Sequence, residues 1–463
     1  MITVIFVAFM ALSMTIALVD WRRGWLLAIV CGVLQDPARK LTPGTPVVMS
    51  LSIVLVYAVV LFAAQKELQL FGREFARRFG NLYAALILMM VFLGLAAVNG
   101  IATFGLVNWK IPALSLFTYC IPIPAVILGY AWLQREEQLI RLFRFYAILT
   151  SIALIGTPLE YFHVSSPLLG TVGIEWNTRF ITGIEVRLLS GFYRAPDIMG
   201  WHAATLTCVG VIMAMSRRTL TRSWPWMLVA GWGFLNCVIS GRRKAVYMVA
   251  AFTAALLWRY IRRLKFAEIV TFVLLGAVLG LVMHQIGTDE EAGVYARGAG
   301  TTQDELFSRL EGGVGETVVQ FGFMGAGLGT ATQGTQHLSG GTGFGWQEGG
   351  LGKLAIELGV PGLLALTFMV MIMMQSLLRI SRHPDIPESS QLMRAGLFAI
   401  FMGDAVAFLA SAQAYSDPLL TLFSAFTLGC LFATSQFDER ARAASAARSA
   451  VMLTHPGTAS ATT

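Results

Sequence analysis

Hydrophobic residues of this chain fall in long continuous runs that short polar segments separate. A run of about 15–25 apolar residues is long enough, as a helix, to cross the hydrocarbon core of a membrane. The runs do not alternate residue by residue, so strands of a membrane barrel are disfavoured, and each span must satisfy its own backbone hydrogen bonds as an α-helix. The predicted spans are 2–19, 22–35, 47–64, 81–97, 112–133, 144–158, 197–215, 224–239, 245–258, 267–284, 351–377, 394–411 and 417–434.

The fold class that this pattern predicts is an all-α polytopic membrane protein with a single transmembrane domain over residues 1–434. The short run 22–35 fits either a span or a re-entrant segment, so we expect 12 or 13 transmembrane helices. Composition agrees, because 56% of the 463 residues are hydrophobic and only 13% are charged. Soluble domains carry about 25% charged residues, and a soluble fold of this composition would expose a large apolar surface.

Clusters of lysine and arginine separate alternate spans, and short cytoplasmic loops collect such residues. The clusters lie at 22–23, 66–78, 135–144, 217–222, 259–265, 379–394 and 440–448. Alternation then places outside the cytoplasm the segments 36–46, 98–111, 159–196, 240–244, 285–350 and 412–416. The longest is the large extracytoplasmic loop 285–350, and the second is 159–196. The tail 435–463 is rich in Ala, Ser, Thr and Arg, and we expect it to be disordered on the cytoplasmic side.

The turn 240–244 conflicts with this charge rule, because Arg242, Arg243 and Lys244 would lie outside the cytoplasm. Two explanations fit the conflict. Either a helix is miscounted, or the cluster binds an anion at the outer membrane surface, such as a lipid phosphate or diphosphate. Arginine suits that role because its planar fork makes two charge-assisted hydrogen bonds at once.

Two more arginines, Arg187 and Arg194, stand shortly before a predicted span. Pro196 and Asp197 are suited to start that helix, because proline fits the first helical position and an acid complements the helix dipole. The arginines have no such explanation. They are either solvated residues at the membrane interface or further phosphate ligands.

The large loop carries the candidates for acid–base chemistry. Glu348 directly precedes an apolar run, so it either complements the dipole of the helix that follows or takes a proton from an attacking hydroxyl. His337, in a segment rich in Gly, Ser and Thr, is a second possible base. Arg309 adds a cation. Glu357 lies deeper in the apolar run, and we expect it to have structural partners.

Several common site types leave no signature in the sequence. It contains no HExxH, GxSxG or Walker pattern, and its five cysteines are scattered singly, so we predict neither a metal nor a cofactor. No basic run with interleaved aromatic residues points to nucleic acid. Chemistry outside the cytoplasm cannot draw on nucleotide sugars directly, whereas a lipid diphosphate would supply a good leaving group there.

Three pieces of the chain, in order, carry a family resemblance: Arg187 to Gly200, Ser240 to Ala245, and Phe323 to Gly329 followed by Glu357 to Gly362. Together they resemble the motifs of the superfamily of O-antigen ligases and O-antigen or exopolysaccharide polymerases. Ligases of this family carry a His-Asn pair before the last piece. Here the corresponding position looks like Glu348, which favours the polymerase branch.

The resemblance implies a GT-C-like integral-membrane glycosyltransferase of a bacterial inner membrane, with its large loop periplasmic or extracellular. It implies a metal-independent, inverting polymerase that uses an undecaprenyl-diphosphate-linked glycan, with a chain-length regulator as a further partner. The ligands of the diphosphate would be Arg187, Arg194, Arg242, Arg243 and Arg309. Glu348 would deprotonate the incoming sugar hydroxyl, and Arg243 would stabilise the leaving diphosphate.

Two other functions remain open from the sequence. A ligase would use the same donor with a lipid or protein acceptor, and Glu348 argues against it without excluding it. A lipid-glycan transporter or flippase would be expected to show pseudo-symmetric halves and charges at mid-membrane. Here the charges gather at one surface and in one long loop.

Overall fold

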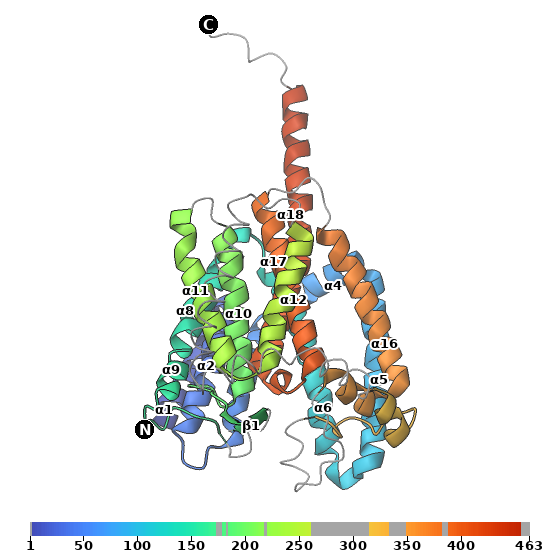
Figure 1. The fold of residues 1–463 in the computed structure, drawn as a ribbon. Coiled ribbons are helices and arrows are strands. Elements are labelled where there is room, and N and C mark those ends of the chain that lie inside the picture. Colours follow the sequence, from blue (N-terminus) through green and yellow to red (C-terminus); the bar gives the residue numbers. More distant parts are fainter. Residues whose placement is uncertain are drawn as a thin grey trace.

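The computed structural model describes residues 2–172, 178–181, 184–216, 220–260, 314–332, 349–381 and 388–454. In these residues the protein is a bundle of α-helices with one short antiparallel hairpin (Figure 1). The hairpin pairs β1 (Thr178–Ile181) with β2 (Ile184–Arg187). The helices are α1 (Ile2–Val19), α2 (Trp21–Lys40), η1 (Val47–Leu51), α3 (Ser52–Ala63), α4 (Gln65–Arg78), α5 (Gly80–Phe104), η2 (Leu106–Asn108), α6 (Lys110–Cys120), α7 (Pro122–Trp132), α8 (Glu136–Ala153), α9 (Gly156–Tyr161), α10 (Pro196–Met215), α11 (Leu220–Ile239), α12 (Arg243–Tyr260), α16 (Gly350–Ser381), α17 (Glu388–Ala410), η6 (Ala414–Ser416) and α18 (Pro418–Thr454).

The prediction of an all-α polytopic membrane protein is confirmed. Among the described residues, eight helical stretches are long and apolar enough to cross a membrane, or nine if the bent pair α3 and α4 counts as one span. Helices α2, α11 and α12 also form at predicted spans but are not among these eight. The predicted span 267–284 lies outside the described residues, so the total of 12 or 13 stays a prediction.

The connecting segments divide between the two ends of the bundle (Figure 1). One end, called here the loop end, holds 41–46, 105–109, 162–172, 188–195, 240–242, 322–332 and 411–417. Hydrogen bonds join these segments: Lys40 Nζ donates to the carbonyl of Gly191 (2.7 Å) and Lys244 Nζ to Ser411 Oγ (2.8 Å). The opposite, basic end holds the connections rich in Lys and Arg. The described parts of the segments that alternation places outside the cytoplasm therefore share one end.

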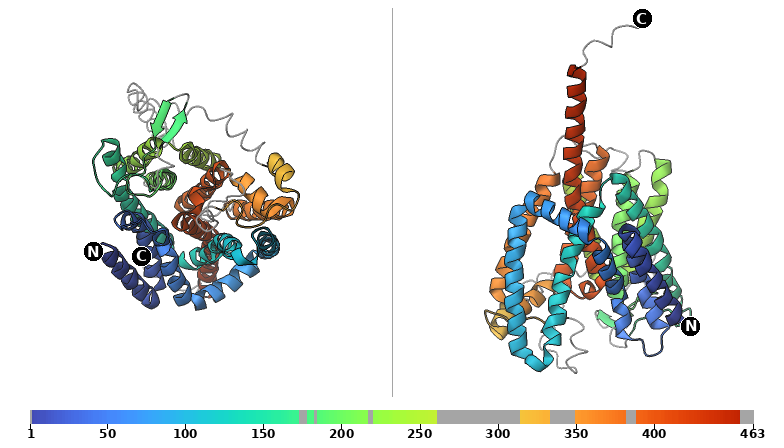
Figure 2. Two further views of the ribbon diagram at one scale, coloured as in Figure 1. Left: turned by 90° about the horizontal axis from the view of Figure 1, so that it is seen from below. Right: turned by 180° about the vertical axis from the view of Figure 1, so that it is seen from behind.

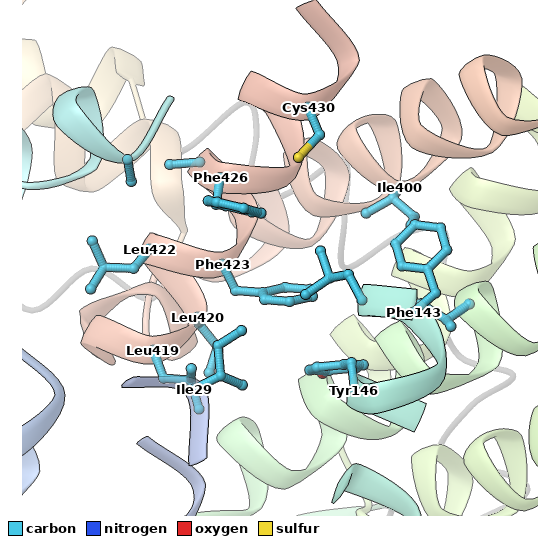
Figure 3. Close-up of a cluster of buried hydrophobic side chains, with 14 of the residues drawn as sticks. Ile29, Phe143, Tyr146, Ile400, Leu419, Leu420, Leu422, Phe423, Phe426 and Cys430 are labelled. Carbon is cyan, nitrogen blue, oxygen red and sulfur yellow. The ribbon is translucent and has the colours of Figure 1, made fainter. Parts of the chain in front are cut away.

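Helices α10 and α18 form the centre of the main core. Nearly every residue of α10 is buried, which explains why its apolar pattern has no polar face. Aromatic side chains join the elements around α18. Phe426 stacks on Trp25 (4.6 Å between ring centroids). Phe423 stacks on Tyr146 (4.5 Å), as Figure 3 shows. This packing joins α2 and α8 to α18.

A second, smaller core joins α5 and α16 through residues such as Leu93, Leu354 and Leu358, and Leu328 of the large loop belongs to it. Helix α16 breaks at Gly359, whose φ of 63° and ψ of −173° interrupt the helical hydrogen bonds. Residues of the large loop form hydrogen bonds with backbone groups at this break. The amide of Ala326 donates to the carbonyl of Ile356 (2.7 Å), and the amide of Val360 donates to that of Phe323 (2.9 Å). The break therefore leaves these two backbone groups satisfied within the membrane domain.

The C-terminal tail differs from the sequence-based expectation over residues 435–454, and its last residues, 455–463, lie outside the described chain. Helix α18 runs without interruption from the bundle through Thr454 and projects beyond the basic end (Figure 1). We expected disorder from 435 onward. The segment is rich in alanine and arginine, which have high helix propensity, and no Gly or Pro interrupts it before Pro456. A helix already nucleated in the bundle can therefore continue through it.

Candidate functional site

The cationic turn, defined as Ser240 to Lys244, connects α11 to α12 at the loop end. Gly241 adopts a φ of 68°, which a residue without Cβ accepts readily. Ser240 Oγ donates to the carbonyl of Cys237 (2.6 Å) and accepts from the amide of Arg242 (3.1 Å). Helix α12 then begins at Arg243. Cations at a helix N-terminus oppose the helix dipole, so this placement requires compensation from elsewhere.

Asp197 supplies part of that compensation. Its carboxylate forms ion pairs with Nε of Arg242 (3.0 Å) and with Nζ of Lys244 (2.6 Å), and its side chain is 9% exposed. Pro196 and Asp197 occupy the first turn of α10, as predicted from the sequence. The same acid that suits a helix start therefore also binds two neighbouring cations across helices.

The backbone of Gly200 in α10 lies close to the side chains of Ser240 and Ala245. A Cβ at Gly200 would lie 3.0 Å from Ser240 Oγ and 3.2 Å from the Cβ of Ala245. A larger residue at this position would push the turn away from Asp197. The first two pieces of the sequence pattern thus form one contact unit in space.

Arg194 lies in a separate ion triad. Its guanidinium pairs with Asp36 (2.8 Å) and with Asp417 (2.5 Å), and all three side chains are largely buried. The two carboxylates balance the charge of Arg194, and each pairs with one of its two terminal guanidinium nitrogens. The triad ties the segment before α10 to α2 and to the start of α18, so we leave Arg194 out of the site proposed below.

A second group of buried hydrogen bonds holds the segment that leads into α10. Glu160 Oε2 accepts from the amides of Ser190 (3.0 Å) and Gly191 (2.7 Å), and Lys40 Nζ donates to the carbonyls of Leu168 and Gly191. Lys40 lies beyond the predicted span 22–35. Burial lowers the pKa of Lys40 to about 8, and the nearby acids only partly oppose this. The chain leading into α10 is therefore held by buried polar contacts.

Glu357 has the structural partners that the sequence analysis expected. Its carboxylate accepts from the amides of Gly329 (3.0 Å) and Ala331 (3.2 Å) and from the hydroxyls of Thr332 (2.7 Å) and Tyr119 (2.6 Å). Ser115 adds a longer contact at 3.4 Å. These bonds fasten the end of the segment 314–332 to α16 and α6. The third piece of the sequence pattern is thus also one contact unit.

The end of α17 contacts both the cationic turn and the start of α16. At the start of α16, a Cβ on Gly350 would run into the backbone carbonyl of Phe408. One turn further along, Ser411 accepts the hydrogen bond from Lys244. Viewed from below, the start of α12 and the start of α16 lie on either side of α17 and α18 (Figure 2). The cationic turn and the start of α16 therefore share one neighbour, the end of α17, and the described chain resumes at Gly349.

For the remaining predicted site residues, the structure describes no side chain. Arg309, His337 and Glu348 lie outside the described residues, and Arg187 ends β2 with only its backbone described. Their predicted roles stay predictions. Of the predicted arginines, the structure places Arg242 and Arg243 together and puts Arg194 in the ion triad.

Sequence reasoning missed two contributors, the cross-helix role of Asp197 and the contact of Ser411 with Lys244. A usable signal was present, because three adjacent cations without a nearby acid in sequence require partners from another segment. Which segment supplies them depends on helix packing.

Comparison with known proteins assigns no family to this chain. A scan against protein-family models and a search of curated proteins each found no match for this chain. Within the described residues, no three His, Cys, Asp or Glu side chains gather as a metal-binding group. The class that fold and composition define is a multi-pass membrane protein.

Proposed function

We propose that the protein is a membrane glycosyltransferase that polymerises an O-antigen or exopolysaccharide outside the cytoplasm. The observation that carries the proposal is the cationic turn at the loop end. Arg242 directly precedes α12, Arg243 and Lys244 begin it, and Asp197 pairs with Arg242 and Lys244. Keeping cations at a helix N-terminus costs free energy, and a bound anion would recover it. A diphosphate at the membrane surface has the charge and the geometry for this site.

The donor in this proposal is a glycan linked to undecaprenyl diphosphate. The hydroxyl oxygen of the acceptor sugar attacks the anomeric carbon, the bond from that carbon to the diphosphate oxygen breaks, and lipid diphosphate leaves. Arg242 and Arg243 stabilise the negative charge on the leaving group, with Arg187 and Arg309 as further candidates. The configuration at the anomeric carbon inverts.

Glu348 is the proposed base that takes the proton of the attacking hydroxyl. Support comes from its chain neighbours, since Gly350 packs on Phe408 and the same end of α17 carries Ser411, the partner of Lys244. Glu348 is two residues before Gly350, so we expect its carboxylate on the same side of the bundle as the diphosphate ligands. His337 is the alternative base.

The wider setting of the proposal is a GT-C-like architecture in a bacterial inner membrane, with the loop end facing the periplasm or the exterior. Its partners would be the lipid-linked oligosaccharide, the bilayer and a chain-length regulator. The transporter alternative gains one feature, the broken helix α16. However, the carbonyl of Ile356 and the amide of Val360 at that break are bonded to the protein's own segment 323–326, so they are not left to coordinate a substrate.

The experiment that tests the proposal incubates the purified full-length protein with an undecaprenyl-diphosphate oligosaccharide in detergent and separates the lipid-linked products by size. Longer lipid-linked glycans support the polymerase. Transfer only to an added lipid or protein acceptor supports the ligase instead. Movement of the donor across vesicles without a new glycosidic bond supports the flippase, and no reaction with any acceptor overturns the glycosyltransferase.

A further inference from the structure

Helix α4 differs from the other helices in its direction. It follows α3 after a break at Ala64, and the two helices are bent by 79° (Figure 2). A helix turned so far from a spanning neighbour runs close to the plane of the membrane. It lies at the basic end, where Arg78 Nη1 donates to Ser435 of α18 (3.0 Å).

One face of α4 is fixed to the bundle by aromatic rings. Phe75 packs edge-on against Tyr130 of α7 (5.4 Å between centroids) and Phe432 of α18 (5.3 Å), and Phe79 packs on Phe432 (4.9 Å). The Tyr130 hydroxyl also donates to Glu74 (3.2 Å). The inward face therefore has its partners within the protein.

The opposite face has a different composition. Lys66, Leu70, Arg73 and Arg77 are all exposed, Leu70 to 62%. Their spacing of four, three and four residues places them on one stripe of the helix. Basic residues around an exposed leucine are typical of helices that lie in the headgroup region of an anionic membrane, where the cations meet phosphates and the leucine enters the acyl boundary.

The acids of α4 do not neutralise this stripe. Glu67 and Glu74 are half-buried and lie about a quarter turn round the helix, on the side of Arg78. Glu74 is engaged with Arg78 (3.7 Å) and with Tyr130. The outward stripe thus carries three cations with no acid among its members.

We propose that the stripe of Lys66, Leu70, Arg73 and Arg77 binds the headgroups of anionic phospholipids in the leaflet at the basic end. This site lies at the other end of the molecule from the cationic turn and does not depend on the proposed function. Charge complementarity selects the lipid, and the exposed leucine between the cations selects a membrane surface over a soluble anion.

The test compares the full-length protein with a triple variant, Lys66→Gln, Arg73→Gln and Arg77→Gln. Both are reconstituted in nanodiscs of phosphatidylcholine with or without phosphatidylglycerol, and retained phosphatidylglycerol is counted by native mass spectrometry. We expect a loss of roughly fivefold in phosphatidylglycerol affinity per removed cation, and a loss of the phosphatidylglycerol-dependent rise in Tm.

A matched control removes three cations from α8 and its N-terminal flank at the same end: Arg135→Gln, Arg141→Gln and Arg144→Gln. This variant should keep most of the phosphatidylglycerol effect. An equal loss in both variants would assign the effect to total charge and overturn the proposal, as would full retention by the α4 variant. If the α4 variant fails to fold, Lys66→Arg, Arg73→Lys and Arg77→Lys should fold and bind normally, and single Gln substitutions then give the loss stepwise.

Discussion

The carboxylate of Asp197 lies 3.0 Å from Nε of Arg242, and this ion pair joins the first turn of α10 to the turn before α12. Two helix starts from different parts of the chain are thereby locked at the same end of the bundle. The neighbouring Arg243 occupies the first position of α12.

Replacing Arg243 by alanine is expected to lower glycan transfer by about 10²–10³-fold, because a charge that stabilises the leaving diphosphate is lost. Arg243→Lys should recover only a small part, since an ammonium cannot form the bidentate contact. Product length and rate are measured with the purified protein. Membrane insertion of each variant is checked separately, and a normal polymer from Arg243→Ala would remove this residue from the site.

Asp197→Asn keeps the size of the side chain but removes its charge. We expect roughly a tenfold loss in kcat/KM, mostly as a raised KM for the lipid-linked donor, because Arg242 and Lys244 lose the group that positions them. Asp20→Asn is the matched control, since Asp20 caps α2 at the basic end and asparagine also caps helices. Unchanged KM in Asp197→Asn would mean that the ion pair serves stability alone.

Glu348→Gln should abolish transfer while donor binding stays intact, because the amide cannot accept the proton of the attacking hydroxyl. Transfer is followed by product analysis and binding by retention of the labelled donor on the immobilised protein. His337→Gln provides the comparison. Full activity in Glu348→Gln together with its loss in His337→Gln would move the base to His337.

Glu357→Ala should destabilise the protein by about 1–3 kcal/mol or more, because the buried amides of Gly329 and Ala331 lose their acceptor. Thermal unfolding in detergent measures the change. Limited proteolysis should show earlier cleavage near the segment 314–332. Glu316→Ala, in the same segment, is the control, and an equal effect of both substitutions would show that Glu357 has no special anchoring role.

Lys40 predicts a pH dependence of stability. Its pKa in the folded protein is about 8, below the usual value of the unfolded chain. Between these two values the unfolded state binds more protons than the folded state, so stability rises with pH in that window. Lys40→Met should remove this part of the slope. Tm measured against pH for both proteins gives the difference, and parallel curves would contradict the assignment.

The sequence predicted the helical membrane fold well, because long apolar runs have few other solutions. It also predicted the helix start at Pro196 and Asp197 and the structural pairing of Glu357. It did not predict that Asp197 reaches Arg242 and Lys244, since that pairing depends on how α10 packs on α12. Arg194 shows the same limit, because its partners Asp36 and Asp417 are far away in sequence.

The uninterrupted course of α18 has a practical consequence for deciding which end of the bundle faces the cytoplasm. Because the helix leaves the bundle at the basic end, a fluorescent protein fused after Thr454 would be displayed on that side of the bilayer. A fluorescent protein that matures only in a reducing compartment would become fluorescent in this fusion if the basic end faces the cytoplasm. The same fusion would stay dark if the bundle were inserted the other way round.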